Sequence, residues 1–96
     1  MKLELIKDGD IRYIAIDGVR TDSVDEWYLT DFCIVLQAVR NHSDLFIALK
    51  DDLIVVEDGF KQDTIPANFC YSFEYFVAFF KQFGVDLSFK GGVFEC

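Results

Sequence analysis

The sequence predicts one α+β domain of two layers, with a mixed or antiparallel sheet and two helices. The 96 residues are 52% hydrophobic, with six glycines and one proline. This composition suits a single packed domain and excludes disordered, fibrous and linker-like chains. Short alternating apolar runs bounded by turn dipeptides indicate hairpins, and two longer segments carry apolar residues at helical spacing. The expected order over residues 1–96 is ββαββαββ.

Residues 1–16 are expected to form the first hairpin. Asp8-Gly9 is a favoured two-residue turn, and it would pair Ile6 with Ile11 and Leu3 with Ile14. One face of this hairpin is then apolar and is expected in the core: Met1, Leu3, Leu5, Ile14 and Ile16. The other face is mixed and partly open to solvent: Lys2, Glu4, Ile6, Ile11 and Tyr13.

A helix is predicted from Ser23 to about His42. Ser23 and Glu26 have the spacing of a capping box, and Arg40-Asn41-His42 suits a helix end. The apolar positions between them follow helical spacing and are expected to face the core: Tyr28, Phe32, Val35, Leu36 and Val39.

The second half is expected to repeat this pattern. Strands 45–50 and 53–57 flank the turn Asp51-Asp52, and a helix runs to about Phe83 with Gly84 just past its end. The core stripe predicted for this helix is Phe69, Phe73, Phe76, Val77 and Phe80. Residues 86–96 are expected to form a third hairpin around Gly91-Gly92.

Residues 17–24 and 58–65 match at an offset of 41, beginning with Asp17-Gly18 and Asp58-Gly59. The match makes Thr64 a helix cap equivalent to Ser23, with Pro66 in the first helical turn. Asp44-Leu45 also recurs as Asp86-Leu87. One interpretation is an internal ββα duplication with units 1–43 and 44–85 and a C-terminal hairpin at 86–96. The other is convergence on common turn and cap residues.

The charge balance points to a basic protein partner. The chain has 17 acidic and nine basic side chains, a net charge of −8. This excess argues against direct binding of nucleic acid or of an anionic membrane. Charged residues interrupt the apolar runs at the N-terminus, where a signal peptide would need about 7–15 apolar residues in succession. We therefore expect a cytoplasmic protein.

No residues with the spacing of a catalytic, cofactor or metal site are found. The chain lacks the glycine patterns of nucleotide-binding loops and the nucleophile elbow of hydrolases. Its single histidine, His42, follows a helix, and the three cysteines Cys33, Cys70 and Cys96 are too far apart in sequence for a zinc motif. The expected protein is not an enzyme and carries neither cofactor nor metal.

Two surfaces are candidates for partner binding. If each helix runs antiparallel to the strand before it, one end of the sheet collects six acids beside two aromatic residues: Asp17, Asp22, Asp25, Glu26, Asp51 and Asp52, with Trp27 and Tyr28. A second stripe on the later helix forms an aromatic patch: Tyr71, Tyr75 and Phe79. The alternatives are acids that lie in solvated turns and a helix enclosed between the sheet and the C-terminal hairpin.

These features favour a small acidic protein that inhibits a basic partner. The function predicted is that of an immunity or antitoxin protein that occludes the active site of a basic toxin such as a nuclease. One alternative is a phage-type inhibitor whose carboxylates mimic nucleic acid. The other is a small intracellular ligand-binding domain or enzyme, for which an apolar pocket is expected. A monomer and a homodimer both fit the sequence.

Overall fold

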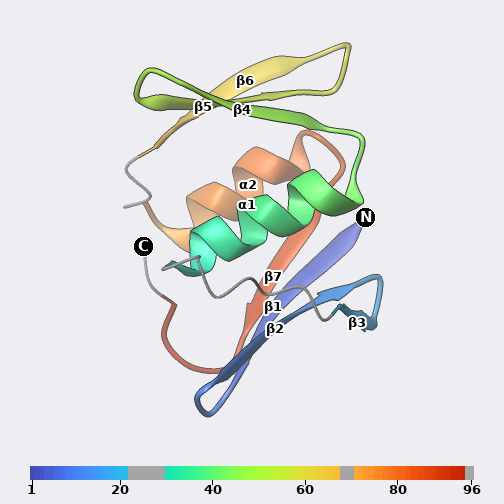
Figure 1. Cartoon of the computed structure of the whole chain (residues 1–96), viewed down its shortest axis with the longest axis vertical. Coiled ribbons are helices and arrows are strands. Elements are labelled where there is room, and N and C mark those ends of the chain that lie inside the picture. Colours follow the sequence, from blue (N-terminus) through green and yellow to red (C-terminus); the bar gives the residue numbers. More distant parts are fainter. Residues whose placement is uncertain (22–29, 68–70, 95–96) are drawn as a thin grey trace.

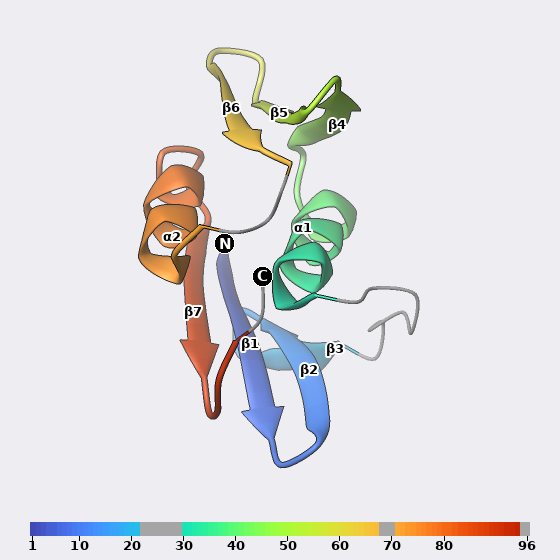
Figure 2. The same cartoon turned by 90° about the vertical axis from the view of Figure 1, so that its left-hand side faces the viewer.

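Two helices lie side by side between two β-sheets in the computed structural model, which describes residues 1–21, 30–67 and 71–94 (Figure 1). The α+β class is confirmed. The expected two layers are corrected to three, because the strands form two sheets that cover opposite sides of the helices (Figure 2). The order is βββαβββαβ. It contains two strands that the sequence patterns did not suggest, because the strand Val19–Thr21 has only three residues and the strand Gln62–Pro66 is mostly polar.

The four-stranded sheet has the order β3-β2-β1-β7, with β1 (Lys2–Asp8), β2 (Ile11–Ile16), β3 (Val19–Thr21) and β7 (Asp86–Lys90). The first hairpin forms, but Leu3 pairs with Ile16, so the register differs by two residues from the predicted one. The turn is Gly9-Asp10, and Gly9 takes the positive φ of 66° that favours glycine at the first turn position. A two-residue shift leaves every side chain on its predicted face.

The three-stranded sheet consists of β4 (Phe46–Lys50), β5 (Leu53–Glu57) and β6 (Gln62–Pro66) in that order. The predicted turn Asp51-Asp52 is confirmed, since Lys50 pairs with Leu53. The prediction for Thr64 and Pro66 is wrong, because both residues lie in β6. Proline is tolerated there because β6 is an edge strand, where one amide is not needed for pairing.

Both helices begin later than expected. Helix α1 (Asp31–His42) starts after Thr30, whose extended backbone and side-chain hydrogen bond to the Cys33 amide mark it as the N-cap. The predicted cap residues Ser23 and Glu26 lie outside the described residues. Helix α2 (Phe73–Lys81) starts after the cap Ser72, and Gly84 follows its end with a φ of 78°, as expected.

The predicted C-terminal hairpin is also wrong. β7 pairs in parallel with β1, and no second strand follows it up to Phe94, where the description ends. Instead, residues 91–94 fold back over the end of β1. The Lys7 ammonium donates to the carbonyl oxygen of Val93 and lies 5.2 Å from the centre of the Phe94 ring.

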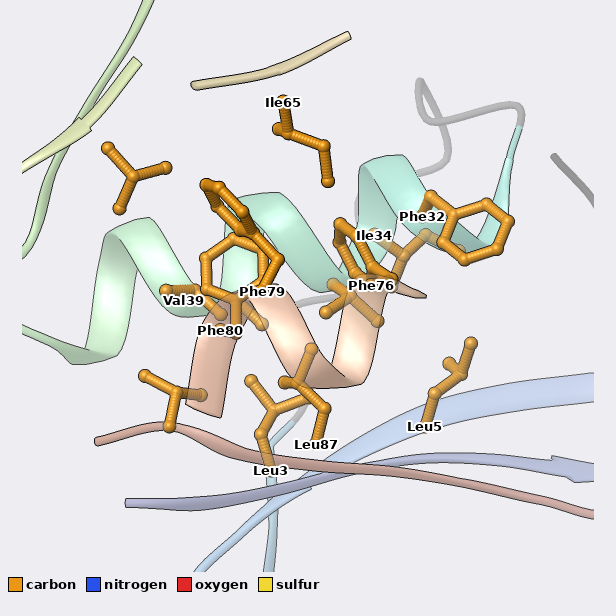
Figure 3. Close-up of a cluster of buried hydrophobic side chains, with 14 of the residues drawn as sticks. Leu3, Leu5, Phe32, Ile34, Val39, Ile65, Phe76, Phe79, Phe80 and Leu87 are labelled. Carbon is orange, nitrogen blue, oxygen red and sulfur yellow. The ribbon is translucent and has the colours of Figure 1, made fainter. Parts of the chain in front are cut away.

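The core lies between the helices and the two sheets. Figure 3 shows the phenylalanines of α1 and α2 between Ile65 of the small sheet and Leu3, Leu5 and Leu87 of the larger one. Phe76 and Phe80 are fully buried and contact each other edge to face. Aromatic side chains are large enough to fill a helix layer that has a sheet on each side, which accounts for much of the phenylalanine excess.

Asp31 is a fully buried carboxylate at the start of α1. One of its oxygens is 2.8 Å from the Lys7 ammonium, and the other is 2.8 Å from the Arg12 guanidinium. Lys7 and Arg12 face each other across β1 and β2, so the strand register places both cations where the helix begins. The positive end of the helix dipole also favours an acidic residue at this position.

Replacing Asp31 by asparagine is expected to lower the free energy of unfolding by about 3 kcal/mol, because two largely buried cations lose their partner. Glu74→Gln is the matched control, since Glu74 is an exposed acid in the first turn of α2. Glu74→Gln should lower the free energy of unfolding by no more than about 0.5 kcal/mol. Urea unfolding of both variants measures the difference, and equal losses would contradict the assigned role of the ion pairs.

Gly91→Ala is expected to destabilise the protein more than Gly92→Ala. Both glycines have positive φ, so alanine costs about 1 kcal/mol at either position. A Cβ on Gly91 would lie 2.2 Å from the Lys7 carbonyl oxygen, whereas on Gly92 its nearest neighbour is the flexible Lys7 side chain at 3.4 Å. In thermal unfolding, the decrease in Tm should be at least twice as large for Gly91→Ala as for Gly92→Ala. A reversed order would show that the segment does not lie against β1.

Candidate functional site

A pocket of about 340 Å³ is lined by Met1, so it lies on the side of the molecule where the chain begins, marked N in Figure 1. We call it the N-terminal pocket. The end of α1, the β5–β6 turn and the segment after α2 meet the first residue there. Its lining residues are Met1, His42, Ser43, Asp44, Leu45, Asp58, Phe83, Gly84 and Val85. The pocket therefore combines two carboxylates with several apolar side chains.

The first two residues connect the pocket to the larger sheet. The Met1 amine donates to the Gly84 carbonyl oxygen at 3.1 Å, and the Asp86 amide donates to the Met1 carbonyl oxygen at 2.8 Å. The Lys2 amide donates to the Asp17 carboxylate at 2.8 Å. The Asp17 carboxylate thus lies against the start of β1, whereas Asp86 pairs with Lys2 on the outer face of the larger sheet.

Asp58 is held as an ionised carboxylate. Its Oδ1 accepts hydrogen bonds from the backbone amides of Phe60 at 2.9 Å and Lys61 at 2.7 Å. These bonds favour the charged form and lower the pKa of Asp58 below its ordinary value. The Asp58 carboxylate at the pocket is therefore negatively charged at neutral pH.

The adjacent residues His42 and Ser43 do not form a nucleophile and base pair. The Ser43 hydroxyl donates to the Val39 carbonyl oxygen at 2.6 Å and accepts from the Leu45 amide at 3.3 Å. Its hydrogen is therefore used in ending α1, while His42 is exposed in the last helical turn. The geometry favours binding over nucleophilic catalysis at this pocket.

The predicted grouping of acids is corrected by the topology. Asp17 lies in the turn after β2 of the larger sheet, whereas Asp51 and Asp52 connect β4 to β5 of the smaller one. Asp51 and Asp52 also lie at the opposite end of β5 from Asp58. Asp44 and Asp58 line the N-terminal pocket instead, and the Asp17 carboxylate is bound to the Lys2 amide. The remaining predicted members lie outside the described residues: Asp22, Asp25, Glu26, Trp27 and Tyr28.

The three residues of the predicted aromatic patch do not form a common exposed surface. Phe79 is only 6% exposed, because the small sheet covers this side of α2. Tyr71 is half-buried, packs against Phe32 and Phe76, and has its pKa raised by burial. Tyr75 alone remains open, with 48% of its surface exposed. Helix α2 is covered on both sides, as the alternative expected, but the second cover is the small sheet and not a C-terminal hairpin.

The sequence did contain a signal for the acidic end that the structure reveals. Asp17-Gly18 and Asp58-Gly59 match at the offset of 41, and Asp44-Leu45 recurs as Asp86-Leu87. Asp17 and Asp58 each lie in the turn after the second strand of a unit, and Asp44 and Asp86 each follow a helix. The repeat therefore marks equivalent places in the two βββα units, while the duplication itself stays a prediction.

A second buried carboxylate, Glu4, lies on the outer face of the four-stranded sheet. The Lys90 ammonium is 2.6 Å from its Oε2, and Lys2 lies 4.0 Å from its other oxygen. The hydrogen bond from Lys90 lowers the pKa of Glu4, and the same bond raises the pKa of Lys90. The mixed face predicted for the first hairpin thus encloses an ion pair.

The buried carboxylate of Asp31 engages two basic side chains. Asp31 is one of the 17 acidic side chains, and its partners Lys7 and Arg12 are two of the nine basic ones. Apart from this cluster, the chain has 16 acidic and seven basic side chains. A field of this sign attracts cationic partners.

The stabilisation from Glu4 is expected to have two pH limits. A lowered carboxyl pKa stabilises the fold above its ordinary value of 4.5, and this effect is lost as the pH falls through the lowered value. A raised amine pKa stabilises below 10.5 and loses its effect as the pH rises through the raised value. The difference in Tm between wild type and Glu4→Gln should be constant between these limits and shrink outside them.

Glu57→Gln is the control for this measurement, since Glu57 is an exposed carboxylate of β5. It should change Tm little between pH 4.5 and 10.5. A Glu4→Gln difference that stayed constant down to pH 2 would show that the ion pair contributes no pH-dependent stability.

None of the comparisons identifies a relative: the chain matches no family model, no curated protein and no solved structure. The residues that the structure describes include no group of three or more histidine, cysteine or acidic side chains placed to hold a metal. Among the same residues, no helix has the length and apolar character needed to cross a membrane. The functional assignment therefore depends on the geometry of the chain itself.

Proposed function

We propose that this protein inhibits a basic protein partner by docking its acidic N-terminal end onto it. The expected partner is a toxin such as a nuclease, so this chain would be an immunity or antitoxin protein. Both proteins would act in the cytoplasm. The observation that carries the proposal is a pocket whose lining combines the acidic residues Asp44 and Asp58 with apolar side chains.

The N-terminal pocket suits the side chain of a lysine or arginine. Such a side chain has an apolar stem and a cationic end, so it fits a site with both apolar walls and carboxylates. Phe83 and Val85 offer the apolar walls, while Asp44 and Asp58 offer the charges. The surrounding acids would steer a basic surface toward this end and accelerate association.

The pocket also supports a second candidate, a small ligand-binding domain. Its volume of about 340 Å³ lies at the lower end of the range for small-molecule sites. The ligand would be a cationic metabolite, because the same carboxylates line the site. Thermal stabilisation by such a compound, with no inhibition of any basic protein, would favour this candidate over the first.

The proposal is tested with the basic proteins encoded beside this chain in its genome. We expect one-to-one binding at about 50 mM salt, a loss of the partner's nuclease activity on binding, and much weaker binding at about 500 mM salt. Isothermal titration calorimetry and a nuclease assay measure these effects. Failure to bind or inhibit any of these neighbours would contradict the proposal.

The double variant Asp44→Asn/Asp58→Asn should weaken this binding roughly tenfold at low salt, because two central carboxylates are lost. Asparagine at position 58 can still accept the turn's hydrogen bonds through its side-chain oxygen. Asp8→Asn/Asp10→Asn is the control, because it makes the same change in net charge at the distant β1–β2 turn. Equal weakening by both variants would show that net charge, and not the N-terminal pocket, determines binding.

A further inference from the structure

The exposed edges of the two sheets differ in how they are protected against pairing with another strand. An edge strand presents free amide and carbonyl groups, and natural proteins protect such edges with short strands, charges or proline. Figure 2 shows β4 and β6 as the outer strands of the small sheet, with β5 between them. β3 and β7 are the outer strands of the larger sheet.

Three of these four edge strands carry recognisable protection. β3 has only three residues and a central arginine, Arg20. β7 has a charged residue at each end and a serine in the middle. β6 ends in Pro66, and its Asp63 lies on the core-facing side, where it accepts a hydrogen bond from Gln82 at 3.0 Å. An inward-facing charge and a missing amide both oppose the addition of a strand.

β4 carries the least protection of the four, a single lysine at its end. Its sequence is Phe-Ile-Ala-Leu-Lys, so the first charge comes at its last residue, and it has neither proline nor glycine. Phe46 is 62% exposed and Leu49 is 70% exposed, which makes this edge apolar as well as open. Leu49 lies on the core-facing side of the sheet, as does Ile54, its partner on β5. Unlike Ile54, Leu49 is not part of the buried core.

We propose that β4 pairs with β4 of a second copy of this chain, in antiparallel orientation about Ala48. In this register Ile47 lies opposite Leu49 of the second copy, and Phe46 lies opposite its Lys50. The core-facing rows of the two sheets then join into one apolar row: Val56 and Ile47 from one copy, and Leu49, Ile54 and Ile65 from the other. The strand is thus complementary to itself at every position.

The outer face supports the same register. Phe46 would lie beside the Lys50 side chain of the second copy, whose stem can pack on the ring and whose ammonium is attracted to its face. Ala48 would meet Ala48 at the symmetry axis, where two small side chains allow close approach. A two-fold axis of this kind closes after two copies and does not extend into a fibre.

The acids near this edge predict how salt affects the dimer. Continuing the register brings Asp44 of one copy opposite Asp52 of the other, and each copy has a net charge of −8. Both effects oppose dimerisation, and salt screens them. The dimer is therefore expected to strengthen with salt, whereas binding of a basic partner is expected to weaken. The two proposals can fail independently.

Sedimentation velocity of the full chain over a range of concentrations tests the dimer. At about 500 mM salt the wild type should shift toward twice its mass of 11.1 kDa at concentrations of roughly 100 μM, since five paired residues make a small interface. The shift should be smaller at about 50 mM salt. A chain that stays monomeric at both salt concentrations up to about 1 mM overturns the proposal.

Two pairs of variants test the register. Leu49→Lys should abolish the shift, whereas Phe60→Lys should leave it unchanged, because Phe60 is fully exposed in the β5–β6 turn of the same sheet. Phe46→Glu should retain the dimer by facing Lys50 of the second copy, and Phe46→Lys should weaken it at least tenfold. Repulsion between whole chains predicts the reverse order for the Phe46 pair. That reverse order, or equal losses for Leu49→Lys and Phe60→Lys, would overturn the proposed pairing.

Discussion

The buried carboxylate of Asp31 is the interaction on which the arrangement of the fold depends. Removing an ionised carboxylate from water is costly, and the cost is offset only when charged partners are close and well placed. Lys7 and Arg12 meet this condition because β1 and β2 pair them opposite each other. The first helix is thereby fixed on the larger sheet. Lys7 also holds Val93 and Phe94, so the C-terminal segment depends on the same cluster.

This use of basic residues connects stability to the proposed function. Lys7 and Arg12 pair with Asp31 inside the fold, so they do not form ion pairs with the acids on the surface. The hydrogen bonds that fix the turns and the first strand also orient Asp17 and Asp58 at one end of the molecule. The hydrogen bonds that stabilise the backbone therefore also fix two of the carboxylates that a basic partner would meet.

The sequence predicted the α+β class, the face of each residue in the first hairpin, and the turn Asp51-Asp52, because alternation depends only on local geometry. It did not predict the second sheet, since Gln62-Asp63-Thr64-Ile65-Pro66 carries helix-start residues that here form an edge strand. Without that sheet, Phe79 was expected on the surface. Asp31 was missed because its partners are distant in sequence and meet it only through strand pairing. The same limit applied to the acidic end, where the repeated Asp-Gly turns were visible but their positions were not.

The small sheet follows from the composition of the helices and creates an open edge in turn. Helix α2 has aromatic residues on more than one side and α1 has buried apolar residues, so the helix layer needs apolar cover on both faces, and β4, β5 and β6 provide the second cover. Three strands necessarily leave two edges, and polar protection on either edge reduces the apolar surface available to the core. β6 carries that protection and contributes one fully buried residue, Ile65. β4 keeps its apolar character instead, so an additional strand would extend the hydrophobic row that Ile47 and Val56 begin. Because the small sheet must cover the helices with apolar side chains, β4 stays apolar and able to pair, whereas β6 carries the protection.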